Sequence, residues 1–254
     1  MYNKTTKRYY FMAPIHHDDE VFRQKRRPKN PIKFKITLNE EQKEAKAKIL
    51  NNTVTLLAGS AGSGKTLLAC QIALEKLFMR EIDKIVITRP TVSKEEIGFL
   101  PGDLREKMDP WVQPIYQNMF ALYDKEKIEK YISDGAIEIV PVSFMRGRTF
   151  LDSVVIVDEA QNVTHEQMQM IVTRIGLRSQ MIICGDDHQV DLKSKRDSGF
   201  RFLYSAARRI KNMLGISLKT NHRDAIVEDL INLYDEAEKQ GLNLGTSGSS
   251  NKRK

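Results

Sequence analysis

One short segment constrains the fold of this 254-residue chain more than any other feature. It is a glycine-rich loop that ends in a Lys-Thr pair: Gly59-Ser60-Ala61-Gly62-Ser63-Gly64-Lys65-Thr66. An apolar run of strand length, 53–58, precedes the loop, and an apolar stretch with helical spacing, 67–78, follows it. The pattern G-x-x-x-x-G-K-[ST] between a strand and a helix is typical of a phosphate-binding P-loop. The alternative is a flexible Gly/Ser loop with an incidental lysine.

The residue types of this loop suit the binding of a nucleoside triphosphate. Glycines allow the backbone N–H groups to converge on phosphate oxygens, and the following helix adds partial positive charge at its N-terminus. We expect Lys65 to reach the β- and γ-phosphates and the Thr66 hydroxyl to ligate Mg²⁺. The sequence therefore predicts ATP and Mg²⁺ as cofactors.

A second apolar run, 153–158, ends in two adjacent carboxylates. Beside the P-loop strand, Asp158 would hold Mg²⁺ through water, and Glu159 would orient and deprotonate an attacking water. The alternative is a helix cap or a solvated turn. Because a small-molecule kinase or a simple nucleotide switch does not require a water-activating glutamate, this pair favours hydrolysis.

A third apolar run, 181–184, also ends in polar residues. Ligands of open α/β sheets bind at the carboxyl edge, where Gln189 has an amide that can sense a γ-phosphate or position water. Cys184 is expected to be a buried small hydrophobe. The residues between them are a candidate metal cluster or a turn of solvated groups: Asp186, Asp187 and His188.

Apolar runs alternate with helical stretches along the chain, which predicts an α/β domain with a mostly parallel sheet and helices on both faces. The expected strands are 53–58, 84–88, 136–140, 153–158 and 181–184. The expected helices begin near Leu38, with Thr37 or Asn39 as cap, and continue with 67–78, 111–132, 164–175, 198–212 and 224–239.

The net charge of +8 comes from the ends of the chain. Residues 1–35 contain ten Lys or Arg against three acidic residues, three further cations end the chain, and the stretch between sums to −2. We expect a basic N-terminal arm over 1–35, one ATPase domain over 36–240, and a flexible Gly/Ser and basic tail over 241–254. The arm is either a nucleic-acid contact or a solubilising tail.

No apolar run approaches the roughly 18 residues that a membrane span needs, so we expect no membrane partner. No apolar signal-peptide core follows the polar N-terminus. Two cysteines, Cys70 and Cys184, are too few for a disulfide framework. A cytoplasmic, reduced protein is the expectation.

Several further segments carry a family resemblance. In order, the P-loop, Asp158-Glu159-Ala160-Gln161, Gly185-Asp186-x-x-Gln189 and Asn221-His222-Arg223 resemble motifs of superfamily 1 helicases. Four strings are similar to the PhoH family of phosphate-starvation ATPases: Thr88-Arg89-Pro90, Gly98 to Leu104, Phe144-Met145-Arg146-Gly147-Arg148-Thr149, and Asp158 to Asn162. The resemblance spans about 38–238 and implies a RecA-like ATPase.

The resemblance also implies roles for five residues outside the loop. Gln42 looks like an adenine-reading glutamine, or is a helix-surface residue. Arg223 resembles an arginine that touches the γ-phosphate, or lies exposed at a helix start. Arg89 resembles a nucleic-acid backbone contact, or forms a structural salt bridge. Arg146 and Arg148 are candidate phosphate contacts or an arginine finger offered to a neighbouring subunit, or they buttress their loop.

Fewer than 35 residues follow Arg223, too few for a second motor lobe. We therefore expect a head-to-tail homo-oligomer that completes the site, and the resemblance implies a hexameric ring. The leading functional prediction is ATP hydrolysis coupled to single-stranded nucleic acid, with RNA favoured over DNA. The alternatives are a slow nucleotide-dependent switch or binding module and, less favoured, a P-loop kinase.

Overall fold

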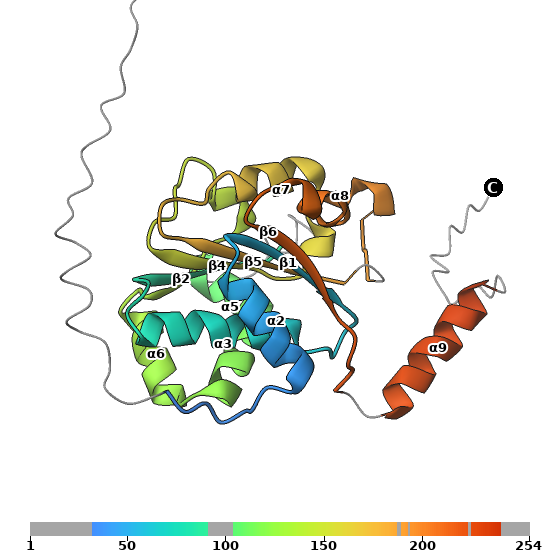
Figure 1. The fold of residues 1–254 in the computed structure, drawn as a ribbon, viewed down its shortest axis with the longest axis horizontal. Helices are drawn as coiled ribbons and strands as arrows, with labels where there is room; N and C mark the ends of the chain where they lie inside the picture. Colours follow the sequence, from blue (N-terminus) through green and yellow to red (C-terminus); the bar gives the residue numbers. More distant parts are fainter. Residues whose placement is uncertain (1–31, 91–103, 187–188, 193, 223–224, 240–254) are drawn as a thin grey trace, which may run out of the picture.

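A parallel six-stranded sheet forms the centre of the protein (Figure 1). The computed structural model describes residues 32–90, 104–186, 189–192, 194–222 and 225–239. The strands are β1 (Val54–Gly59), β2 (Lys84–Thr88), β3 (Ile137–Ile139), β4 (Ser153–Val157), β5 (Gln180–Gly185) and β6 (Met213–Leu218). They lie in the order β3-β2-β4-β5-β1-β6, and every neighbouring pair is parallel.

Helices cover both faces of this sheet. One face packs against α2 (Glu40–Leu50), α3 (Lys65–Phe78), α5 (Leu104–Leu122) and α6 (Lys125–Ser133), and the other against α7 (His165–Val172) and α8 (Gly199–Ala206). The helix α9 (Ala225–Lys239) follows β6, and short 3₁₀ turns include η1 (Val142–Phe144), η2 (Ala160–Asn162), η3 (Lys195–Asp197) and η4 (Ala207–Arg209). The predicted α/β class, a single RecA-like P-loop domain, is confirmed.

The inner strands are continuously apolar because both of their faces are buried. All five residues of β4 are buried, and Leu56 and Leu57 of β1 point into the two opposite cores. The α3 helix contributes seven buried apolar residues to the core that it shares with α2, α5 and α6. This packing fixes the carboxyl ends of β1, β4 and β5 at one edge of the sheet.

Several details differ from the sequence predictions. The helix expected over 198–212 ends at Ala206 and is followed by the 3₁₀ turn η4. The acidic strand β4 does not lie beside the P-loop strand, because β5 pairs with both β1 and β4. The helix expected over 111–132 is two helices, since the Asp124 side chain accepts a hydrogen bond from the Lys127 backbone N–H and starts a new one. The edge strand β6 was not predicted.

The structure describes only a small part of the expected N-terminal arm and none of the expected C-terminal tail. Residues 1–31 of the expected arm and 241–254 of the expected tail lie outside the described residues. Phe34 already packs on Tyr123, with ring centroids 6.1 Å apart, and the Lys35 backbone N–H donates to the Leu122 carbonyl. Within the described part of the chain, no helix has the length and apolar character needed to cross a membrane.

Candidate nucleotide site

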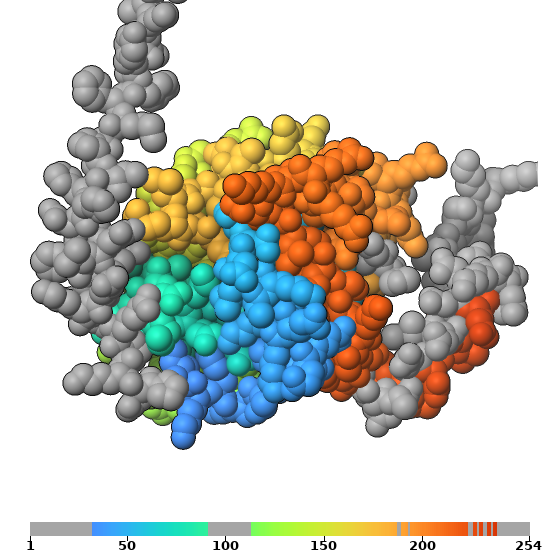
Figure 2. Space-filling view, viewed as in Figure 1, coloured from blue at the N-terminus to red at the C-terminus, as the bar shows by residue number. Residues whose placement is uncertain are grey.

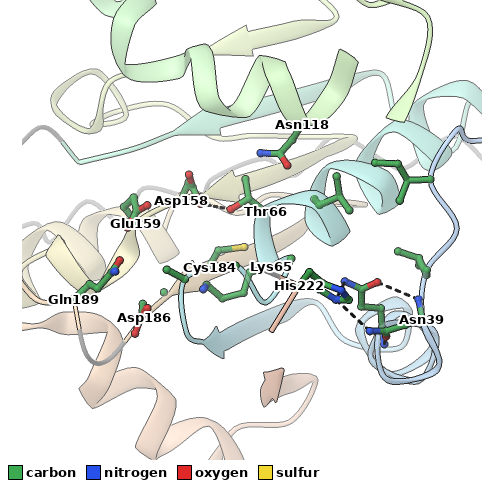
Figure 3. A pocket seen from close by; sticks show the side chains of 18 of the residues that line it. Asn39, Lys65, Thr66, Asn118, Asp158, Glu159, Cys184, Asp186, Gln189 and His222 are labelled. Carbon is green, nitrogen blue, oxygen red and sulfur yellow. Dashed lines mark hydrogen bonds between the residues drawn. The ribbon is translucent and has the colours of Figure 1, made fainter. Parts of the chain in front are cut away.

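The P-loop connects the end of β1 to the first turn of α3 and forms the floor of a cavity of about 830 Å³ (Figure 3). Gly64 has a φ of +81°, a left-handed conformation that favours glycine. A Cβ atom at this position would lie 2.5 Å from Nε2 of Gln42, so glycine also lets the Gln42 amide lie against the loop. Ser63 is buried and donates to the Ser60 carbonyl at 2.8 Å.

Lys65 lies folded over its own loop. Its Nζ donates to the carbonyl oxygens of Gly59, at 2.7 Å, and Ser60, at 2.9 Å. Ala61, Gly62 and Gly64 line the cavity together with Lys65. A phosphate entering the loop would therefore meet an ammonium group that can exchange two neutral carbonyl partners for charged oxygens.

Thr66 and Asp158 meet across 92 residues of sequence. The Thr66 hydroxyl donates to Oδ1 of Asp158 at 2.8 Å, and both residues line the cavity (Figure 3). Burial raises the pKa of the Asp158 carboxyl, and the neighbouring charge of Glu159 raises it further. The contact forms although β5 separates their strands, because α3 packs on one face of the sheet and contacts both β5 and β4.

This oxygen pair fits Mg²⁺. A hydroxyl and a carboxylate are hard ligands, and a divalent cation would offset the cost of the buried Asp158 charge. Among the described residues there is no group of three or more His, Cys, Asp or Glu that could hold a metal ion. Mg²⁺ would therefore have few protein ligands here and would take others from phosphate and water.

Glu159 is held at the edge of the same cavity. Its backbone has a φ of +51°, which is a strained conformation for a residue with a side chain and is found preferentially at functional sites. One carboxylate oxygen pairs with Arg89 at 3.4 Å, and the other accepts a hydrogen bond from Gln161 at 2.6 Å. Arg89 thus forms the salt bridge that was the alternative to a nucleic-acid contact.

Gln161 was not predicted as a site residue, although it belongs to the motif that ends β4. Its side chain is buried, and its Oε1 accepts a hydrogen bond from the Asp186 backbone N–H at 3.0 Å. One amide therefore ties the end of β4 to the end of β5. Gln189 lines the cavity from the following turn, where its N–H donates to the Asp186 carbonyl at 3.3 Å. Asp187 and His188 lie outside the described residues.

Gln42 and Asn39 form a reciprocal cap at the start of α2. The Gln42 backbone N–H donates to the Asn39 side chain at 2.7 Å, and the Asn39 N–H donates to Gln42 Oε1 at 3.2 Å. Because both side-chain amide oxygens accept hydrogen bonds from backbone N–H groups, the two NH₂ groups remain as donors to residues outside the cap. They lie 3.2 and 3.4 Å from Nε2 of His222, whose backbone N–H donates to the Gly62 carbonyl.

The remaining cavity residues come from distant elements. His222 follows β6 and belongs to the Asn221-His222-Arg223 motif without a predicted role of its own, whereas Asn118 lies in α5 with no sequence signal for a site. In Figure 3 the Asn118 side chain is drawn near Thr66 and Asp158. Arg223 itself lies outside the described residues, but its neighbour His222 lies on the P-loop.

Arg146 and Arg148 are not among the residues that line the cavity. Arg148 donates to both oxygens of Glu138, at 2.9 and 3.0 Å, and its guanidinium lies 5.1 Å from the Phe150 ring centroid. Glu138 also accepts from Lys84 at 3.0 Å. Arg148 thus buttresses the β3 edge, and its use as an arginine finger would require this ion pair to open.

Replacing Glu138 with glutamine is expected to lower the free energy of unfolding by about 1 kcal/mol at neutral pH. The hydrogen bonds from Arg148, and then from Lys84, hold the pKa of Glu138 below its usual value. A lowered folded-state pKa stabilises the fold above the unfolded-state pKa, and this stability is lost as the pH falls through the folded-state value. Urea unfolding at pH 7 and at a pH below the folded-state pKa should therefore show a difference that disappears in acid. Glu129→Gln, on exposed α6, is the control, and an equal loss at both pH values would contradict the ion-pair explanation.

Cys70 and Cys184 are both buried and free. Burial raises the pKa of each thiol, with the charge of Asp158 adding to the effect. A thiol-specific reagent should therefore label neither cysteine in the folded protein and both in urea, with protection of about 100-fold or more. Mass spectrometry after timed labelling measures this; fast labelling of the native protein would show that the sheet edge opens.

Comparison with known proteins identifies the family. The family model described as PhoH-like protein matches residues 35–235. The PhoH-like protein of Bacillus subtilis is 41% identical over 201 residues, covering 77% of this chain and 62% of the relative. The PhoH-like protein of Synechocystis is 38% identical over 193 residues, covering 75% and 59%. The chain thus spans about 60% of the length of these curated relatives.

Among solved structures, the chain is similar to Pif1 helicase from Candida albicans, with a TM-score of 0.43 and 18% identity over 79% of this chain and 44% of that one. It is also similar to the UvsW helicase from bacteriophage T4, with a TM-score of 0.45 and 15% identity over 80% and 67%.

Proposed function

This chain belongs to the PhoH-like protein family, and we propose that it is a Mg²⁺-dependent ATP hydrolase. The observation that carries the proposal is the hydrogen bond between Thr66 and Asp158, which joins the P-loop to the acidic strand end at the cavity. Lys65, on the same helix turn, supplies the cation that triphosphate binding needs.

In this proposal each side chain has one task. The P-loop amides and Lys65 hold the β- and γ-phosphates, while Thr66 and Asp158 would hold Mg²⁺, which neutralises charge that develops on the phosphate oxygens. Glu159 takes a proton from a water whose oxygen bonds to the γ-phosphorus, as the bond to the β–γ bridging oxygen breaks. The products are ADP and phosphate. Gln189, in the turn after the neighbouring strand β5, positions the water or senses the γ-phosphate.

We propose that Gln42 reads the nucleobase. Its Oε1 already accepts a backbone hydrogen, so its Nε2 is held as a donor directed at the cavity. A donor in this position suits an acceptor nitrogen of adenine. Asn39 and His222 keep the amide in this orientation.

Two further parts of the proposal extend beyond the nucleotide site. We propose that hydrolysis is coupled to single-stranded nucleic acid, RNA in preference to DNA, and that the protein works as a homo-oligomer, with a hexameric ring as the expected form. The basic arm over 1–35 and the family resemblance support the first. The exposed apolar helix described below supports the second. The free, buried cysteines are in keeping with the cytoplasmic location we propose.

A slow nucleotide-dependent switch is the second candidate, and one observation favours it. Both carboxylate oxygens of Glu159 are engaged, one by Arg89 and one by Gln161. Both oxygens of Glu159 therefore already have partners, and the Arg89 contact would have to open before one of them could contact an attacking water. An activator that draws Arg89 away, such as a nucleic-acid phosphate, would convert the switch into an efficient hydrolase.

Phosphate release should be measured with and without single-stranded RNA or DNA at two salt concentrations. Stimulation that fades at high salt, as phosphate contacts require, supports the coupled ATPase. Very slow turnover that neither nucleic acid nor salt changes supports the switch. ATP consumption only with an added small-molecule acceptor would contradict both.

A further inference from the structure

The helix α9 stands apart from the body of the domain (Figure 1). Four apolar residues on it are between 47% and 60% exposed: Ile226, Leu230, Leu233 and Tyr234. Their spacing places them on one face over more than two turns. An isolated helix of 15 residues is marginal in water, so a stripe of this kind indicates a surface that another element covers.

The same helix is acidic. Five of its residues are Asp or Glu and one is Lys, which gives a net charge of −4. Asp229 and Glu236 are exposed beside the apolar stripe. A partner surface should therefore combine exposed apolar side chains with cations and contain few acids.

The segment from α8 to η4 has this composition. Residues 198–212 contain four cations and no acid, and the cations Arg201, Arg208, Arg209 and Lys211 are all exposed. Among them lie Phe202, 61% exposed, and Ile210, 52% exposed. In Figure 2 this segment forms a continuous orange surface along the upper side of the molecule, away from α9.

We propose that α9 of one copy docks on the α8–η4 surface of a neighbouring copy of this chain. The apolar stripe would cover Phe202 and Ile210, and charges of −4 and +4 would face each other. A nucleic acid bound to the cations would leave the α9 stripe exposed, whereas one contact between copies covers both surfaces. This inference deepens the homo-oligomer of the proposed function and rests on that part of it.

The contact would be head-to-tail, because the two surfaces lie on different parts of the chain and each copy presents both. It would also act on the nucleotide site. The segment that leads into α9 contains His222, which contacts the P-loop carbonyl of Gly62 and the side chains of Asn39 and Gln42. Docking of α9 on a neighbour would therefore fix this side of the cavity.

Light scattering on the full chain tests the proposal with three variants. One places Leu230→Asp and Leu233→Asp on α9, one places Arg208→Glu and Arg209→Glu on η4, and the control places Lys125→Glu and Lys127→Glu on α6. The wild type and the control should assemble, whereas each of the first two variants should have the mass of a monomer at the same concentration. We expect the association to weaken tenfold or more in each. ATP binding and circular dichroism show that each variant is folded.

Mixing the α9 variant with the η4 variant gives a more specific test. Each retains one intact surface, so the mixture should form a 1:1 dimer and nothing larger. A chain that combines Arg208→Glu and Arg209→Glu with Asp229→Lys and Glu236→Lys should assemble again. If the wild type assembles and the variants do so equally, the docking surface is wrong while the homo-oligomer stands. If the η4 variant loses RNA affinity at unchanged mass, the surface binds nucleic acid instead.

A wild type that is monomeric during full ATP turnover would overturn both this inference and the proposed homo-oligomer, while leaving the ATPase itself intact. The proposal is also wrong if α9 docks on its own domain. In that case the mixed variants would stay monomeric, and the four-substitution chain, as a monomer, would be more stable to unfolding than the chain with Arg208→Glu and Arg209→Glu alone.

Discussion

Lys65→Ala is expected to weaken the binding of MgATP about 100-fold or more and to abolish hydrolysis. The loss of a cation that faces phosphate oxygens inside a cavity costs on the order of 3 kcal/mol, and tenfold in affinity corresponds to about 1.4 kcal/mol. Among the described residues, the Lys65 ammonium donates hydrogen bonds to two neutral loop carbonyls and forms no ion pair. Alanine therefore leaves no buried charge unpaired, and the fold should survive.

Calorimetric titration with MgATP measures this effect, and thermal unfolding verifies that the variant is folded. The control is Lys76→Ala, which removes the same charge from the last turn of the same helix. If Lys65→Ala bound MgATP with wild-type affinity, the loop would not be the phosphate site. A loss in both variants would point to α3 stability instead.

Glu159→Gln should separate binding from chemistry. Glutamine keeps the shape of the side chain but cannot accept a proton from water, so we expect MgATP affinity within about threefold of wild type and hydrolysis reduced by roughly 10²- to 10⁴-fold. Phosphate release and nucleotide binding should be measured on the same sample. The variant also removes the charge that Arg89 pairs with, which should leave binding intact.

The control for this change is Glu166→Gln, an exposed carboxylate in the first turn of α7 that does not line the cavity. It should hydrolyse ATP at the wild-type rate. Normal hydrolysis by Glu159→Gln would show that another group activates the water, and a loss of binding would show that Glu159 has a structural role at the strand end.

Much of the fold could be predicted because its signals are local. The P-loop pattern predicts a strand before it and a helix after it. Runs such as 153–157 are apolar throughout because both faces of the strand are buried. Strand order could not be predicted, because all the buried strands have similar apolar sequences. No residue in 181–184 indicates that this strand lies between the P-loop strand and the acidic strand.

The two other misses have local causes. The strand β6 is at the edge of the sheet and contains Gly215 and Ser217, so its apolar pattern is weak. The break between α5 and α6 depends on one capping residue, Asp124, inside a stretch with continuous helical spacing.

The cavity brings together motif residues that the sequence singled out, and it adds three that were given no site role: Gln161 and His222, which lie inside motifs, and Asn118, which does not. Gln161 joins two strand ends through a single amide, and His222 meets Asn39 over 183 positions of sequence. Asn118 reaches the cavity because α5 packs on α3. None of these contacts has a local sequence pattern, because each depends on how strands and helices that are distant in the sequence pack together.

The most direct test of the ATPase is phosphate release from γ-labelled ATP by the wild type, Lys65→Ala and Glu159→Gln in excess Mg²⁺ and in EDTA. We expect Mg²⁺-dependent release by the wild type only, together with retained nucleotide on Glu159→Gln. Equal release by the wild type and Lys65→Ala, or release that EDTA does not change, would contradict the account.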